Sequence, residues 1–135
     1  MEILIENTIS SEVKKIVLPV KNGLNFYAIC NIIRCHSQNS YTEFFIQEEE
    51  EDVENKYFKL VVSKGFEHYQ DYLVSKGDFY RVHNQHLVNI RHISKFINTN
   101  NSYLIMDDLS GEMIPVARAR KEAFLNYLKT KGFQP

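Results

Sequence analysis

The sequence predicts a mainly β domain of about ten short strands with one short internal helix and a C-terminal helix. Short apolar runs recur along the chain, and in several of them apolar and polar residues alternate as in a half-buried strand. Clusters of Asn, Gly, Ser and Asp separate these runs and are typical of turns. With 135 residues, of which 44% are hydrophobic, the chain has the size of one domain with a single core.

The first half of the chain predicts strands and hairpins. Residues 1–12 show no clear period and are interpreted as a lead-in or linker remnant, which places the domain at residues 13–135. An Asn22–Gly23 pair between apolar runs at 14–19 and 24–27 indicates a hairpin. Strands are expected at 29–35, 41–47 and 57–62, with a polar loop at 37–40.

The second half predicts both helices. Phe66, Tyr69 and Leu73 recur at helical spacing, which indicates a short helix at 65–74 that Ser63 could cap. Strands at 94–98 and 103–106 form a hairpin around the polar residues 99–102, and a last strand covers 112–116. Residues 118–129 carry one apolar helical face and form the terminal helix.

The most informative stretch is residues 79–93, a strand, a polar corner and a second strand. The corner is His83-Asn84-Gln85-His86, four consecutive side chains with donors and acceptors. An Asn or Gln amide matches the edge of adenine, and a His or Arg can reach the acceptors of guanine. The alternative is an ordinary solvated hairpin turn, which is the commoner use of such residues.

This stretch resembles the best-marked segment of the LytTR family, the DNA-binding output domain of many bacterial response regulators. The segment follows the pattern F-x-R-x-H-R-S-x-L-V-N-x-x-x-I. The matching positions are Phe79, Arg81, His83, Leu87, Val88, Asn89 and Ile93. Residues 31–46, 60–73 and 114–124 resemble three further family segments, so the similarity spans residues 13–131.

The resemblance implies an elongated stack of antiparallel β-sheets that inserts loops into DNA grooves to control transcription. It implies the output module of a two-component system, preceded by a receiver domain if the chain is a fragment. It also implies direct-repeat promoter sites on double-stranded DNA, occupied by two copies of a domain that is monomeric in solution.

The family's DNA-contacting positions map onto Arg118, Asn84 and Tyr41. We add as backbone or less certain contacts a set of neighbouring residues, namely His83, Gln85, Asn39, Ser40, Arg120 and Lys121. Free N–H groups at the strand-to-helix junction near Arg118 also favour an anion. On the residues alone, Arg118 and Arg120 could equally be solubilising charges.

Two departures from the family pattern alter what is presented to DNA. The Arg-Ser that follows the motif's His is Asn84-Gln85 in this chain, and His36 stands where the family usually has an acidic residue. The target sequence therefore does not follow from the resemblance.

The net charge of −1 hides an asymmetry along the chain. Residues 48–54 alone carry six acids, and without them 16 basic residues face 11 acidic ones. A basic face can bind phosphate even when the total charge is negative, because the electric field at the contact patch matters more than the total charge. The acidic run is expected to be a solvated hairpin loop, or alternatively a guard against self-association or misplaced DNA contact.

Other classes of protein fit the sequence less well. Cys35, His36, His83 and His86 match no metal-ligand spacing, and strand geometry sends Cys35 and His36 to opposite faces, so we expect no enzyme, no cofactor and no metal. Cys30 and Cys35 fit reduced thiols better than a disulfide. Without a membrane span or signal peptide, we expect a cytoplasmic protein. The alternative function is a β-rich ligand- or partner-binding module that does not bind DNA.

Overall fold

The computed structural model describes residues 14–48 and 56–133, and it confirms the mainly β fold class. Within these residues ten antiparallel strands form three sheets. The strands are β1 (Lys15–Val20), β2 (Gly23–Ala28), β3 (Ile32–Gln38), β4 (Tyr41–Glu48), β5 (Lys56–Val62), β6 (Phe79–His83), β7 (His86–Asn89), β8 (Ile93–Asn98), β9 (Ser102–Met106) and β10 (Ile114–Val116). The helices are α2 (Glu67–Lys76) and α3 (Lys121–Thr130), with short 3-10 turns η1 (Ile29–Asn31), η2 (Ile90–His92) and η3 (Arg118–Arg120).

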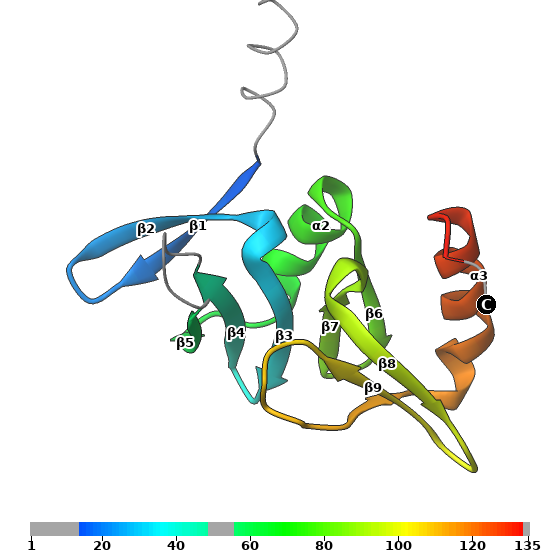
Figure 1. Ribbon diagram of the computed structural model, residues 1–135. Helices are drawn as coiled ribbons and strands as arrows, with labels where there is room; N and C mark the ends of the chain where they lie inside the picture. Colours follow the sequence, from blue (N-terminus) through cyan, green and yellow to red (C-terminus); the bar gives the residue numbers. More distant parts are fainter. Residues whose placement is uncertain (1–13, 49–55, 134–135) are drawn as a thin grey trace, which may run out of the picture.

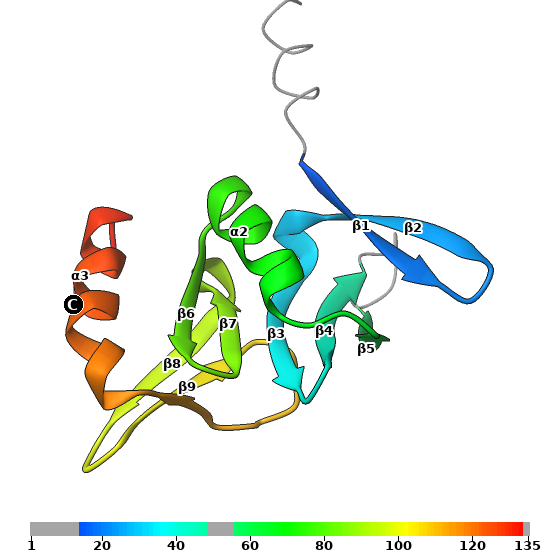
Figure 2. The same cartoon turned by 180° about the vertical axis from the view of Figure 1, so that it is seen from behind.

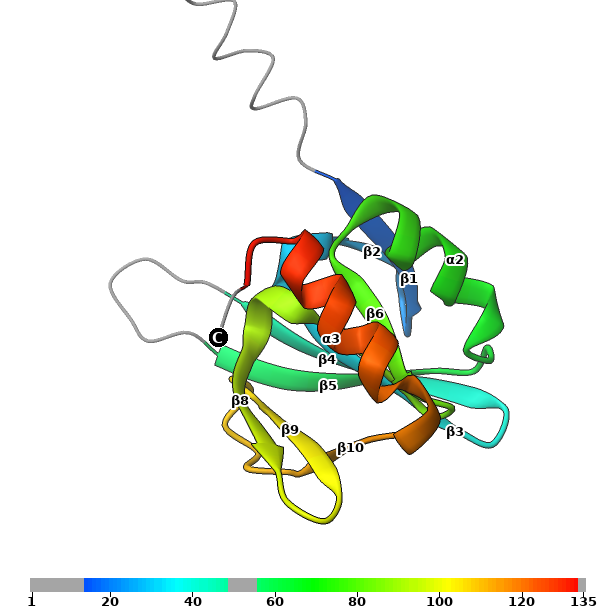
Figure 3. The same cartoon turned by 90° about the vertical axis from the view of Figure 1, so that its right-hand side faces the viewer.

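The three sheets follow one another along the molecule (Figure 1). The β1–β2 hairpin lies at one end, the five-stranded sheet β5-β4-β3-β7-β6 lies in the middle, and β10-β9-β8 lies at the other end with α3. Seen from behind, α2 lies between the β1–β2 hairpin and β6 (Figure 2). From the side, α3 crosses over β6 (Figure 3). The expected elongated stack of antiparallel sheets is therefore present.

The five-stranded sheet is buried on both faces, which gives the domain two packed clusters. One face packs against the β1–β2 hairpin and α2, with Phe44, Leu73 and Phe79 at its centre. The other packs against β8–β10 and α3, with Leu104 and Phe124 almost without exposure. Truncation of such a buried Phe to Ala typically costs about 3–5 kcal/mol of stability, so both faces hold the central sheet in place.

The predicted hairpin at Asn22–Gly23 is present, and Gly23 has a φ of +148° that favours glycine. The predicted strand at 29–35 is wrong at its start, because Ile29–Asn31 forms η1 and β3 begins at Ile32. The predicted loop at 37–40 is shorter than expected. Ser37 and Gln38 continue β3, since they pair with β4, and only Asn39 and Ser40 turn.

Both helices differ slightly from the prediction. Ser63 does not cap α2, since the N-cap position is Phe66 and no side chain caps it. The helix is held instead by Tyr69 and Leu73, four residues apart and both buried, and it ends where the Gly77 N–H meets the Leu73 carbonyl at 2.9 Å. At the C-terminus, residues 118–120 form η3 rather than the first turn of α3.

Two predictions fall on residues outside the described ones: the lead-in at 1–12 and most of the acidic run at 48–54. Among residues 14–48 and 56–133, no helix is long and apolar enough to span a membrane. Cys30 is exposed and Cys35 is buried, and both are free thiols. Burial raises the pKa of the Cys35 thiol well above its usual range, because the thiolate loses its solvation.

Candidate nucleic-acid interface

Three connections that are distant in sequence meet at one edge of the central sheet. The β3–β4 turn lies beside the β6–β7 turn, because His36 pairs with His86 and the Ser37 N–H donates to the Gln85 carbonyl at 2.9 Å. The β10–η3 connection joins them, since the Ala117 N–H donates to the Val82 carbonyl at 2.8 Å. We call this the loop edge, formed by residues 39–41, 83–85 and 117–121, and it lies along the bottom of Figure 1.

The Asn84–Gln85 turn is held by arginines on both sides. Arg81 donates from Nη2 to the Asn84 main-chain carbonyl at 2.6 Å and from Nη1 to Gln70 Oε1 at 2.7 Å. Arg120 donates from Nη2 to Asn84 Oδ1 at 3.3 Å and from Nη1 to the Arg81 carbonyl at 3.4 Å. The side-chain amide N–H₂ of Asn84 has no partner among the described residues, and both Asn84 and Gln85 are exposed.

His83 has a defined tautomer in its neutral form. The Gln85 main-chain N–H donates to His83 Nδ1 at 3.1 Å, so this nitrogen is an acceptor and the ring proton lies on Nε2. The side chain is half-buried at the end of β6. The loop edge therefore offers a second donor beside the Asn84 amide, of the kind that meets a base acceptor or a phosphate.

The β3–β4 turn is tight and open to solvent. Asn39 has a φ of +54°, in the left-handed region that Asn tolerates better than most residues, and both Asn39 and Ser40 are exposed. Tyr41 is half-buried and pairs with Gln38 across the turn. This geometry presents the Asn39 and Ser40 side chains outward beside the second turn and keeps Tyr41 at their base.

The third connection contains both an unpaired cation and a cation that already has a hydrogen-bond partner. Arg118 is exposed and, among the described residues, has no hydrogen-bond or ion-pair partner. Lys121 donates from Nζ to Asn98 Oδ1 at 2.7 Å, which ties the start of α3 to the β8–β9 hairpin. A hollow of about 80 Å³ lies between Arg118, Lys121 and the tip of that hairpin. Of the cations in this connection, Arg118 is thus the most available to a ligand.

A fully buried arginine anchors the chain segment that leads to the loop edge. Arg34 on β3 donates from Nε to Asp108 Oδ2 at 2.7 Å and from Nη2 to Glu112 Oε1 at 2.8 Å. Its guanidinium carbon lies 3.5 Å from the centroid of the Phe45 ring. Because residues 107–113 connect β9 to β10, these ion pairs anchor the chain segment that leads to Arg118. We call Arg34, Phe45, Asp108 and Glu112 the buried arginine cluster.

The cluster also sets the charge of Asp108. Burial alone would raise the pKa of this carboxyl, but the Arg34 guanidinium and two hydrogen bonds from Ser110 outweigh burial and lower the pKa. Asp108 therefore remains ionised and paired at neutral pH. Arg34 Nη1 is buried without a hydrogen-bond partner among the described residues.

Three imidazoles line the ends of β3, β6 and β7 behind the loop edge. His36 stacks on His86 with ring centroids 4.5 Å apart, and His83 meets His86 edge-on at 5.5 Å. His86 is buried, and its Nδ1 has no hydrogen-bond partner within the residues that the structure describes. Burial, together with the positive charges of His36, His83 and Arg34 when present, lowers the pKa of His86 to about 3. His86 therefore stays neutral and acts as packing.

His36 occupies the position where an acid was expected, and the structure supplies the acid from the next strand. Glu43 is the cross-strand partner of His36, with its Oε1 3.0 Å from His36 Nδ1 and its Oε2 3.1 Å from Lys59 Nζ. Burial opposes ionisation of Glu43, but the hydrogen bonds from His36 and Lys59 prevail and lower its pKa. The negative charge is thus retained one strand away.

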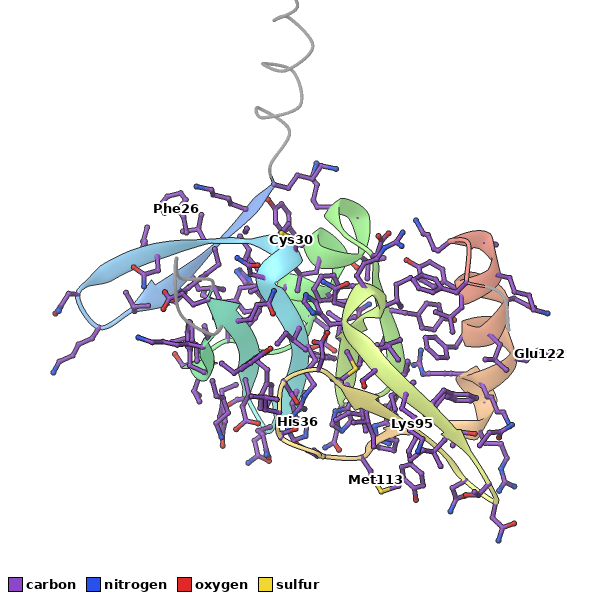
Figure 4. All side chains as sticks on the ribbon, viewed as in Figure 1. Phe26, Cys30, His36, Lys95, Met113 and Glu122 are labelled. Atoms are coloured by element: carbon purple, nitrogen blue, oxygen red, sulfur yellow. The ribbon has the colours of Figure 1, made fainter. Side chains whose placement is uncertain are left out.

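Of the residues considered for enzyme or metal chemistry, the three histidines lie together and Cys35 lies on the other face of the sheet. Cys35 lies in the cluster against α2, whereas His36 points to the lower side of the molecule (Figure 4). Among the described residues, no group of three His, Cys, Asp or Glu side chains could hold a metal ion. The opposite orientation of Cys35 and His36 agrees with the strand-based expectation.

All nine candidate residues lie in the three connections of the loop edge. The sequence analysis missed two features of this edge, namely the buried arginine cluster and the Lys121–Asn98 contact. A charged residue in the otherwise apolar run Ile32–Cys35 was the one available signal for the first. The second joins residues 23 positions apart and leaves no local pattern.

Comparison with known proteins identifies one family. The model of the LytTr DNA-binding domain matches residues 22–129. Among solved structures, a LytTr DNA-binding domain from Bacillus cereus superposes with a TM-score of 0.61 at 21% identity, covering 88% of this chain and 97% of that one. No curated protein matches the sequence. The structural likeness supports the fold, and the family match extends over all three connections of the loop edge.

Proposed function

Because this chain belongs to the LytTR family of DNA-binding domains, a non-catalytic family typical of the output modules of bacterial transcriptional regulators, we propose that its loop edge reads double-stranded DNA. One observation carries the proposal: three connections from separate parts of the chain place exposed amides and a free arginine side by side. Amides and arginine are the side chains that pair with base edges, and cations meet phosphates.

In the proposed complex the three connections have different roles. Asn84 and Arg118 contact bases, since their donors are exposed and the turn around Asn84 is already held by Arg81 and Arg120. Such preorganisation reduces the entropy lost on binding.

The remaining residues of the loop edge position the domain. Arg120 and Lys121, which already make internal contacts, contact the phosphate backbone together with the turn at Asn39 and Ser40. His83 and Gln85 support the Asn84 contact, and Tyr41 orients the first turn.

The proposed biological setting is a cytoplasmic transcriptional regulator of a two-component system, in which residues 13–135 form the DNA-binding domain. Three short connections cover too few base pairs for high specificity on their own. We therefore expect two copies on a direct-repeat promoter site, with a domain that is monomeric off DNA. If the chain is a fragment, a receiver domain precedes it.

The test is a binding titration with a pool of genomic DNA fragments at several salt concentrations. Log affinity should fall with log salt by a slope of about 0.9 for each phosphate neutralised. Arg118→Gln should weaken binding, whereas Lys14→Gln, which removes the same charge from the end of the β1–β2 hairpin, should not. The absence of binding at low salt, or equal losses in the two variants, would contradict the proposal.

A second titration tests the direct repeat. A fragment carrying two half-sites separated by about one helical turn, 10–10.5 base pairs, should bind two copies with a higher affinity per site than a fragment carrying one. Sedimentation of the free protein should show a monomer. A tight dimer in the absence of DNA, or equal affinity for single and tandem sites, would contradict the two-copy arrangement.

A further inference from the structure

The β1–β2 hairpin has an apolar face that the described residues leave uncovered. Ile16 and Leu18 point into the core, while Val17 and Pro19 point away from it. Their cross-strand partners Phe26 and Leu24 point the same way, and each residue is 62% exposed. Exposed apolar residues gathered on one face, rather than scattered, mark a contact surface. We call these four side chains the hairpin face.

The hairpin face is bordered by cations. Residues 14–28 contain Lys14, Lys15 and Lys21 and no acidic residue. All three lysines are exposed, and none has a carboxylate partner among the described residues. Phe26 lies on the upper side of the molecule in Figure 4, whereas His36, beside the loop edge, lies on the lower side. A ligand of this face would be apolar and acidic, and it would not compete with DNA.

We propose that residues 1–13 of the same chain cover the hairpin face. This segment contains six apolar residues and three acids, and it lacks any lysine or arginine, so its chemistry complements the face. The acids are Glu2, Glu6 and Glu12. Thirteen residues can span at most about 45 Å, whereas a six-residue strand is about 20 Å long, so the segment has ample length to return along the hairpin from Lys14.

Other occupants from this protein fit less well. A second copy that offered its own hairpin face would bring Lys15 and Lys21 against the same lysines, and like charges in contact oppose association. The acidic residues 48–54 would satisfy the lysines, but Val53 is the one apolar side chain they contain. Residues 1–13 contain both the apolar side chains that could cover the hairpin face and the acids that could pair with the lysines around it.

The proposed contact has a physical purpose at this end of the molecule. An isolated two-stranded hairpin is marginally stable in water, and β1–β2 forms a separate sheet with no third strand among the described residues. It is fixed to the rest by its inner face and by the Tyr72 hydroxyl, which donates to the Lys15 carbonyl at 2.7 Å. A covering segment would bury the outer face and shield it from association with other molecules.

The chain contains no tryptophan, which permits a single-probe experiment on the full-length protein. Phe26→Trp places the probe in the hairpin face, and Leu24→Trp serves as a second position should the first disturb folding. Phe133→Trp, at the other end of the molecule beyond α3, is the matched control, since Phe133 is also partly exposed. The readout is quenching of tryptophan fluorescence by acrylamide.

Each probe is combined with two triple variants of the segment. The first reverses its charges, by Glu2→Lys, Glu6→Lys and Glu12→Lys. The second removes apolar side chains, by Ile3→Ser, Ile5→Ser and Ile9→Ser. We expect each set to increase quenching of the probe at position 26 several-fold and to leave the probe at position 133 unchanged. Added salt should increase quenching in the chain with the native segment and have less effect after charge reversal.

Two results would overturn the proposal. Equal quenching at position 26 in all three segment backgrounds would show that the segment does not cover the face. Quenching that depends on protein concentration would assign the covering segment to a second copy. Neither readout involves DNA, so failure of this inference is distinct from failure of the proposed DNA binding.

Discussion

The buried arginine cluster and the loop edge use the same kind of side chain in opposite environments. Arg34 is fully buried and makes two ion pairs at 2.7 and 2.8 Å, whereas Arg118 is exposed and unpaired among the described residues. Burying a charge is costly unless it is paired, so Arg34 has its partners within the domain. Arg118 keeps its water and its full set of donors, and it can exchange that water for phosphate or base contacts.

The comparison indicates that a buried, paired arginine contributes to stability, whereas an exposed, unpaired arginine is available for binding. The two arginines are linked, because the segment that carries Asp108 and Glu112 leads through β10 to Arg118. The rigid cluster therefore supports the free cation. Removing Arg34 should reduce stability, and removing Arg118 should reduce binding alone.

The largest effect is expected for Arg34→Ala. It leaves Asp108 buried without its cationic partner, and we expect the free energy of unfolding to fall by about 3–5 kcal/mol in urea titrations. Arg91→Ala is the matched control: Arg91 pairs with Asp78 at 2.8 Å, but about half of its side chain is exposed. Loss of that pair should cost about 1 kcal/mol or less. Equal costs for the two variants would remove the distinction between buried and exposed pairs.

Arg118→Ala should affect binding and leave stability unchanged. A cation that pairs with a base contributes about 1–3 kcal/mol, so the dissociation constant for the best site should rise by about 5- to 150-fold. Unfolding of the variant should match the parent within about 0.5 kcal/mol. A stability loss as large as that of Arg34→Ala would instead place Arg118 in the folded framework.

His86 extends the comparison to pH. Its pKa is lowered to about 3 in the folded state by burial and by its positive neighbours, whereas the unfolded chain has the ordinary value of about 6.5. Between these two values the unfolded state binds a proton that the folded state does not. This contribution to stability is therefore complete above about pH 6.5 and falls as pH decreases towards about 3, by up to about 1.4 kcal/mol per pH unit.

His86→Phe should flatten this dependence, because it keeps a ring against His36 and removes the buried, unpartnered Nδ1. The measurement is the free energy of unfolding between pH 6.5 and 5.5, at least about one pH unit above the ordinary pKa of Glu and Asp carboxyls. A steep pH profile that persists unchanged in His86→Phe would assign the proton uptake to other groups.

The smallest effect is expected for Lys121→Ala. Lys121 already donates to Asn98, so it contributes a charge near the backbone rather than a base contact. We expect all DNA sequences to bind more weakly by the same factor, and the slope of log affinity against log salt to fall by about one unit. A loss confined to one base position would make Lys121 a reader of sequence.

Local pattern predicted much of the fold. The Asn22–Gly23 turn and the polar residues 99–102 defined two hairpins, and the spacing of Tyr69 and Leu73 defined α2. Helix starts were less predictable. Ser63 resembled a cap, but α2 begins only at Glu67, because the Phe66 side chain that precedes it is buried in the core. Packing decided that boundary, and packing is not a local property of the sequence.

Family motifs predicted the residues of the candidate site, but they did not predict the ion pairs and hydrogen bonds that hold these residues in place. Arg34 lies 74 residues from Asp108 and 78 from Glu112, so no spacing could reveal that they pair. Likewise, the motif named Asn84 but not the hydrogen bonds from Arg81 and Arg120 that hold its turn. Contacts between distant segments follow from the sheet order, which puts the β3–β4 turn beside the β6–β7 turn.

The most direct test of the loop edge is a binding titration of Asn84→Ala against the best DNA site and each of its single-base variants. Asn84 is exposed, and its amide N–H₂ has no partner in the described part of the chain while its Oδ1 accepts from Arg120. We predict a loss of about 1–3 kcal/mol on the best site and a loss of preference at one base position, with unfolding unchanged. Unchanged affinity and preference in a folded Asn84→Ala would show that the turn is structural alone and would contradict the account.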